Sequence, residues 1–144
     1  MIYLIVFLLL SSCSNPKYAT TSVFDKPFKY YNSGNIYKEY YKNGYQKYEI
    51  KRMNGKLDGC SRYWNKEGKL INQVCYSNDI LHGEWKEFHS NEELKYFIIY
   101  NYGLKEGYEY WYHENGKKKS ETLYESGEVI LKTIRWNKNG GLIY

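Results

Sequence analysis

The sequence has little proline and no hydrophobic run long enough to cross a bilayer. Two prolines among 144 residues leave the chain free for continuous strand pairing, because proline cannot donate to a sheet ladder. The longest apolar run, residues 2–10, is far shorter than the roughly 20 residues that a membrane-spanning helix needs. This run therefore indicates the hydrophobic core of a secretory signal peptide.

Motifs typical of catalysis or metal binding are also missing. The sequence contains no pair of cysteines or histidines at metal-ligand spacing and no nucleophile-elbow pattern. Of the histidines, His82, His89 and His113, the last two occupy equivalent places beside turns. The carboxylates near turns are typical of solvated turn residues. We therefore predict no catalytic residue, no metal site and no cofactor.

Aromatic residues are abundant, and they lie on a repeat of 24 residues. The chain has 19 tyrosines and 4 tryptophans, and aromatic residues make up 19% of it. An aromatic residue recurs four positions before a turn that usually carries glycine. These aromatic positions are Tyr40, Trp64, Phe88, Tyr112 and Trp136. A fixed period over several copies indicates that one small unit is stacked, and that no copy buries its apolar side chains alone.

Each repeat unit is predicted to be a β-hairpin. The turns leave room for strands of about five or six residues and none for a capped helix. Successive hairpins would pair edge to edge, since an isolated hairpin is only marginally stable in water. The predicted fold class is all-β, an antiparallel hairpin meander that forms one twisted sheet. Full units are expected at 36–59, 60–83, 84–107 and 108–131, with a half unit at 132–144.

The N-terminal residues differ from the repeats. Leu10-Ser11-Ser12-Cys13 follows the apolar run and resembles the lipobox of bacterial lipoproteins. The resemblance implies cleavage before Cys13, a diacylglycerol on its sulfur, and an extracytoplasmic protein anchored in the cell envelope. In a bacterium with two membranes the destination would be the outer membrane. We predict a signal peptide at 1–12, the lipidated cysteine and a tether at 13–27, and a repeat domain at 28–144; a plain signal peptide or a short buried strand is the alternative for the apolar run.

Two further cysteines, Cys60 and Cys75, are candidates for a disulfide. A two-residue turn at Glu67-Gly68 would pair Trp64 with Ile71. Counting outward from that turn then pairs the two cysteines, whereas a three-residue loop would shift the register by one. Export to an oxidising compartment would favour the disulfide. The alternative is a pair of buried free thiols in an apolar column.

The pattern of turns and aromatic residues resembles the MORN-variant repeat. The best matching stretches are residues 40–44, 54–59 and 108–117, and the resemblance covers about residues 30–140. It implies a sheet of stacked hairpins that serves protein–protein contacts or, elsewhere, phosphoinositide membranes. Bacterial members include YwqK-type proteins, which are often described as antitoxin or immunity components. Choline-binding cell-wall repeats look similar, but their unit is shorter than the one found here.

We therefore predict a non-enzymatic repeat protein that presents aromatic side chains to a protein partner, which could be a toxin. Tyrosine and tryptophan dominate binding hot spots, so the bulkiest rings of the repeats are the candidate contacts. They are Tyr63, Trp85, Tyr102, Tyr110 and Trp111. The alternative for each ring is a place in the core.

The charge and the repeat bear on three other kinds of partner: an anionic surface, nucleic acid and a second copy of the chain. The net charge of +5 would also suit an envelope module that binds an anionic lipid or a cell-wall polymer. An exported protein rarely meets nucleic acid, so we expect no nucleic-acid partner. The half unit at the C-terminal end, which carries Trp136, would allow two copies to pair edge to edge as a homodimer.

Overall fold

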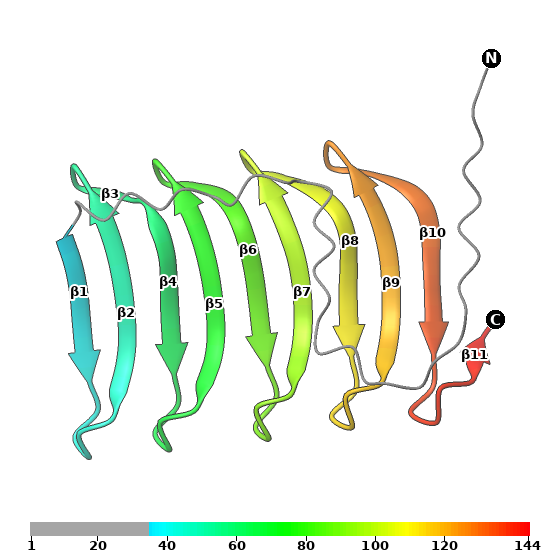
Figure 1. The fold of residues 1–144 in the computed structure, drawn as a ribbon, viewed down its shortest axis with the longest axis horizontal. Helices are drawn as coiled ribbons and strands as arrows, with labels where there is room; N and C mark the ends of the chain where they lie inside the picture. Colours follow the sequence, from blue (N-terminus) through cyan, green and yellow to red (C-terminus); the bar gives the residue numbers. More distant parts are fainter. Residues whose placement is uncertain (1–34) are drawn as a thin grey trace, which may run out of the picture.

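A computed structural model describes residues 35–144, which form one antiparallel β-sheet in a single layer (Figure 1). Its strands are β1 (Asn35–Tyr40), β2 (Gln46–Met53), β3 (Lys56–Leu57), β4 (Gly59–Trp64), β5 (Leu70–Ser77), β6 (Ile80–Phe88), β7 (Leu94–Asn101), β8 (Leu104–Tyr112), β9 (Lys118–Glu125), β10 (Glu128–Trp136) and β11 (Leu142–Ile143). The spatial order follows the chain order, except that the short β3 pairs with β2 off the main path. The predicted all-β hairpin meander is therefore confirmed.

The predicted signal peptide, the lipidation site Cys13 and the tether lie outside the described residues, as do the first residues of the predicted repeat domain. Among residues 35–144, no helix is long and apolar enough to cross a membrane. Most full strands have eight or nine residues, more than the five or six expected.

The turns at one end of the sheet contain two residues each. Both residues have positive φ, as in Asn54 (51°) and Gly55 (81°), and the same holds at Ser126-Gly127. This is the type I′ geometry, whose twist matches that of the flanking strands and which favours asparagine followed by glycine. Asn54-Gly55 and Ser126-Gly127 follow this preference closely, whereas Asn78-Asp79 and Tyr102-Gly103 adopt the same geometry with a less typical residue.

The turns at the other end are longer than predicted. In the hairpin of β4 and β5, the amide of Asn65 donates to the carbonyl of Lys69 (2.9 Å), which leaves a loop of three residues rather than two. Gly68 closes this loop with a φ of 79°, and the Tyr45 ring lies so close that an added Cβ would come within 2.7 Å of it. A side chain at this position would therefore be disfavoured for two reasons: the positive φ of the backbone and the clash with the Tyr45 ring.

The predicted pairing of Trp64 with Ile71 is wrong, because the three-residue loop sets Trp64 opposite Leu70. A β-bulge follows at once and shifts the register back by one residue. Cys60 consequently faces Cys75, and their sulfurs are bonded in the structure. Closing a loop with a sequence separation of 15 stabilises a fold by about 3 kcal/mol in the chain-entropy account.

Side chains divide between two faces, since directly paired residues of neighbouring strands point the same way. We call the first the ladder face; it carries Glu49, Arg62, Gln73, Lys86, Phe97 and Tyr110, which pair in succession across the sheet. The opposite side is the ring face; it carries Tyr48, Tyr63, Asn72, Glu87, Tyr96 and Trp111 in the same manner.

The core lies mainly on the ring face. Six of its residues are buried: Ser61, Val74, Tyr96, Ile98, Glu109 and Thr122. Ile98 is 0% exposed although the sheet has only one layer, because the rings of neighbouring strands enclose it. Trp85, for example, pairs directly with Ile98 and contacts Tyr96 and Tyr100 at 6.0 Å between ring centroids. The large rings thus replace the second layer that most sheets need.

Candidate binding surfaces

Hydrogen bonds between successive units fix the long turns. His89 Nε2 lies 3.0 Å from the carbonyl oxygen of Tyr112, and His113 Nε2 lies 2.9 Å from that of Trp136. The Tyr41 hydroxyl donates in the equivalent place of the first unit. Because a carbonyl can only accept, each Nε2 carries the proton. These contacts give both histidines a structural role in joining one repeat to the next.

Acidic and histidine side chains join the short turns in a similar way. Asp58, His82 and Glu106 recur every 24 residues, and each accepts a hydrogen bond from a turn amide in the following unit. The distances are 3.3 Å, 3.3 Å and 2.9 Å. At His82 the acceptor is Nδ1. These polar groups therefore serve the contacts between units, and among residues 35–144 no three metal-ligating side chains gather.

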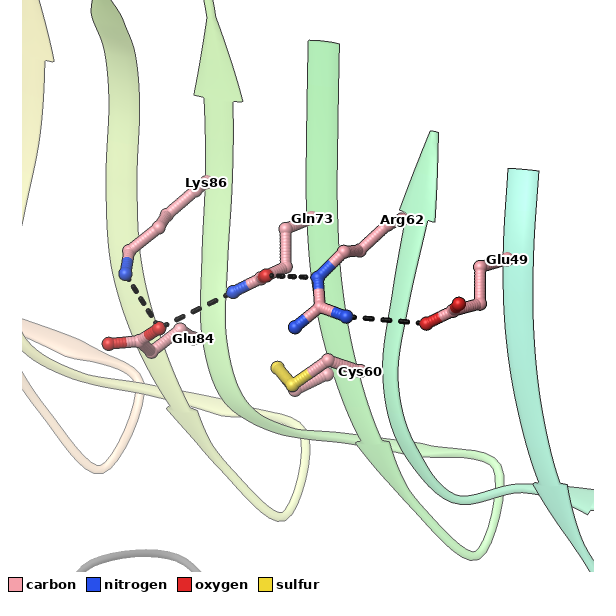
Figure 2. The surroundings of a disulfide bond; sticks show 7 residues. Glu49, Cys60, Arg62, Gln73, Glu84 and Lys86 are labelled. Atoms are coloured by element: carbon pink, nitrogen blue, oxygen red, sulfur yellow. Dashed lines mark hydrogen bonds and ion pairs between the residues drawn. A yellow bond between two sulfur atoms is a disulfide. The ribbon is translucent and has the colours of Figure 1, made fainter. Parts of the chain in front are cut away.

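The N-terminal half of the ladder face is a chain of polar contacts from β2 to β6 (Figure 2). Arg62 is at its centre, 3.3 Å from Glu49 and 2.9 Å from the Gln73 side-chain oxygen. Glu84 continues the chain, 3.5 Å from the Gln73 amide and 2.7 Å from Lys86. The disulfide lies beside this chain in Figure 2. Since cations and anions are paired here, this half offers little net charge to a partner.

The C-terminal half of the ladder face is mainly aromatic and aliphatic, with the ion pair of Lys118 and Glu121 among these side chains. Tyr108, Tyr110 and Tyr112 follow one another along β8 on this face, with 5.6 Å and 6.1 Å between successive ring centroids. Phe97 stacks on Tyr110 at 6.4 Å. Aliphatic residues of β9 and β10 extend the surface, because Tyr108 pairs with Leu123. We call this surface the apolar patch; it consists of Phe97, Tyr108, Tyr110, Tyr112, Leu123, Leu131 and Ile134.

Part of the apolar patch is open to solvent. Tyr108 is 42% exposed, Leu131 51% and Ile134 42%. Tyr110 lies deeper, and burial together with the nearby Glu121 carboxylate raises the pKa of its hydroxyl. Lys118 borders the patch, with its ammonium 4.8 Å from the Tyr110 ring centroid and bonded to Glu121 at 2.6 Å. Exposed aliphatic and tyrosine side chains beside each other are typical of a protein-binding surface.

On the ring face, Glu109 is the centre of a buried polar cluster. Its carboxylate accepts a hydrogen bond from the Tyr96 hydroxyl (2.9 Å) and forms an ion pair with Lys105. The Lys105 ammonium also lies 4.7 Å from the Tyr124 ring centroid. Burial, followed by the bond to Glu109, raises the pKa of Tyr96 far above its ordinary value. Burial opposes the charge of Lys105, but its hydrogen bond and ion pair with Glu109 raise its pKa.

Because of this cluster, we expect the free energy of unfolding to fall at alkaline pH. An unfolded tyrosine loses its proton near pH 10, whereas folded Tyr96 retains it, so the folded state binds more protons above that pH. Its stabilisation is complete below about pH 10 and declines as the pH rises further. We expect the urea midpoint to fall between pH 9.5 and about 11.5, and Tyr96→Phe to make that fall shallower. An unchanged slope in the variant would contradict this assignment.

The structure distributes the five predicted contact residues over different surfaces. Tyr63, Trp85 and Trp111 point to the ring face, where they are half-buried among other rings. Tyr110 lies on the ladder face. Tyr102 is 66% exposed in a short turn, where it contacts the His82 ring at 4.5 Å.

Sequence reasoning missed the exposed members of the apolar patch. Tyr108, Leu131 and Ile134 do not stand out by type, and only their neighbours across the sheet bring them together. One signal was available: Tyr108, Tyr110 and Tyr112 alternate along one strand, so they must share a face.

Comparison with known proteins identifies the repeat. Residues 57–78, 81–101 and 105–129 match the MORN repeat variant. Each matched segment covers all or nearly all of one hairpin, formed by β4 and β5, β6 and β7, or β8 and β9. No curated protein and no solved structure is significantly similar to the chain.

Proposed function

Three successive hairpins of this chain are MORN-variant repeats, and from this premise we propose that the protein is a non-enzymatic module that binds a protein partner. Repeat proteins of this kind serve in binding, because stacking places similar side chains in rows along an extended surface. We assign the contact to the apolar patch of the ladder face. Of the five rings expected from the sequence, this assignment keeps only Tyr110.

The exposure of the apolar patch is the observation that carries this proposal. Tyr108 and Leu131 flank Leu123 in one row across β8, β9 and β10, and both are exposed. Tyrosines and aliphatic side chains beside each other bury a large area at low cost in side-chain entropy. In the preceding unit the positions of Tyr108 and Tyr110 hold Glu84 and Lys86 of the polar chain, so the patch is confined to the last repeats.

We further propose that the partner is met at the cell envelope, with the domain held there by a lipid on Cys13. Such a location and the resemblance to YwqK-type proteins would suit an immunity protein that neutralises a toxin. The second candidate, an envelope module on an anionic lipid or polymer surface, has less support, because the cations of the ladder face are largely paired.

A matched pair of variants tests the patch. Tyr108→Asp places a charge in the patch, whereas Tyr37→Asp places one on the ring face at similar exposure, 42% against 49%. The full-length variants are used to capture proteins from the envelope of the native cell. We expect Tyr37→Asp to retain the partner that the wild type captures, and Tyr108→Asp to weaken it by about tenfold or more.

Three results would count against this function. Equal capture by both variants would remove the patch as the contact. Equal loss of the partner from both variants would indicate that the contact is not confined to the ladder face. Binding to anionic vesicles or cell-wall polymer without any protein would favour the second candidate.

A further inference from the structure

Among residues 35–144, the outer edge of β10 is largely unpaired. This strand has nine residues, but β11 pairs only with Arg135 and Trp136 (Figure 1). Within residues 35–144, no other strand lies on that side of β10. Three consecutive side chains near its start are exposed: Val129 at 53%, Ile130 at 50% and Leu131 at 51%. An exposed strand edge of this kind is a template for another strand.

Two exposed carboxylates stand at the beginning of this edge. Glu125 and Glu128 flank the Ser126-Gly127 turn and lie directly opposite each other in the hairpin of β9 and β10. Neither forms an ion pair within residues 35–144, and both are exposed. Like charges in such a pair are destabilising. The equivalent pairs in the two preceding hairpins are Ser77 with Ile80 and Asn101 with Leu104, so the acidic pair is not a requirement of the repeat.

We propose that an extended segment of the partner protein adds to β10 as an antiparallel strand, with a lysine or arginine beside Glu125 and Glu128. The inference rests on the proposed binding function and specifies the chemistry of the partner. Main-chain hydrogen bonds would satisfy the free groups of residues 128–134. A cation would relieve the repulsion between the two carboxylates.

The edge is continuous with the apolar patch, which supports the same occupant. Leu131 pairs with Leu123 and Ile134 with Glu121, so both side chains of β10 point to the ladder face. An apolar side chain of the added strand would contact Leu131 and Ile134 from the far side. The partner would thus cover the apolar patch and, at the same time, pair with the edge of β10 that borders it.

Synthetic peptides test this inference on the full-length protein. The probe is a nine-residue peptide of alternating valine and threonine with one terminal lysine. A twin carries glutamate in place of the lysine, and a third is N-methylated at every residue, so that neither of its edges can donate to the ladder. We expect the lysine peptide to bind about fivefold more tightly than the glutamate twin. We expect the N-methylated peptide to bind more than about tenfold more weakly, because several main-chain hydrogen bonds are lost.

Charge variants identify the site. In Glu125→Gln/Glu128→Gln the preference for lysine should disappear, and in Glu125→Lys/Glu128→Lys it should reverse. Glu67→Gln, at an exposed carboxylate in the loop between the interior strands β4 and β5, is the matched control and should keep the preference. A thermal melt shows whether each variant is folded; the Gln pair should melt no lower than the wild type, since it removes a repulsion.

The possible results distinguish a failure of strand addition at β10 from a failure of the proposed protein-binding function. Equal binding of both charged peptides, no binding of any peptide, or a preference that survives the Gln pair would overturn strand addition at β10. Self-association that excludes the peptides would also overturn it, in favour of the predicted edge-paired homodimer. None of these results would change the outcome of the capture test with Tyr108→Asp. Binding at the apolar patch could therefore still hold if strand addition at β10 were disproved.

Discussion

Replacing Glu109 by alanine is expected to lower the free energy of unfolding by about 3–5 kcal/mol, which would unfold many domains of this size. The carboxylate is buried, at 9% exposure, and holds both the Tyr96 hydroxyl and the Lys105 ammonium. Its removal leaves a charge and a hydroxyl without a partner among aromatic rings. Urea unfolding, followed by tryptophan fluorescence, measures the loss.

The repeat itself provides the control for this prediction. One unit earlier, the places of Glu109 and Lys105 are occupied by Trp85 and Leu81. Glu109→Leu combined with Lys105→Leu removes both charges, and we expect it to cost far less than Glu109→Ala alone, because replacing a whole buried pair is often nearly neutral. If the double variant were the less stable of the two, the cluster would be a net source of stability.

Replacing Ile98 by alanine is expected to cost about 2–5 kcal/mol, the usual range for a large side chain removed from a packed core. Ile98 is 0% exposed and pairs directly with Trp85 on the ring face. With a single layer of sheet, no second layer can move in to fill the cavity. The same urea titration gives the change in free energy.

Ile134→Ala is the matched control, since it is the same substitution at a residue that is 42% exposed on a strand near the end of the sheet. Its expected cost is below about 1 kcal/mol. Similar losses at both positions would contradict the view that the rings of the ring face enclose a tightly packed core.

The candidate surfaces lie where the last repeat departs from the others. Residues that recur every 24 positions, such as Asp58, His82 and Glu106, are used in contacts between units. The exposed carboxylate pair and the aliphatic residues of β10 have no counterpart in the earlier hairpins. In a repeat protein, the shared positions therefore maintain the fold, and the positions that differ are free to specify a partner.

The sequence alone determined the architecture, because its signals are local. The period of 24 residues set the unit, and the recurring turn residues at 54–55, 78–79, 102–103 and 126–127 set the short turns, where both residues have positive φ. Low proline content allowed the strands to pair without interruption. Each of these signals acts within a few residues of the chain, and so the hairpin meander could be predicted without any long-range information.

The tertiary structure alone decided the details of register and burial. The three-residue loop at Gly68 and the bulge between Tyr63 and Trp64 offset each other, and only together do they bring Cys60 opposite Cys75. The sequence did not show that Glu109 is buried, because its burial depends on rings from neighbouring strands. The sequence also did not show that the face carrying Trp111 is enclosed, whereas the face carrying Tyr110 is partly exposed. Which face of a single-layer sheet is enclosed depends on the sizes of the side chains that meet across strands. These contacts are a property of the packed sheet and not of any one segment.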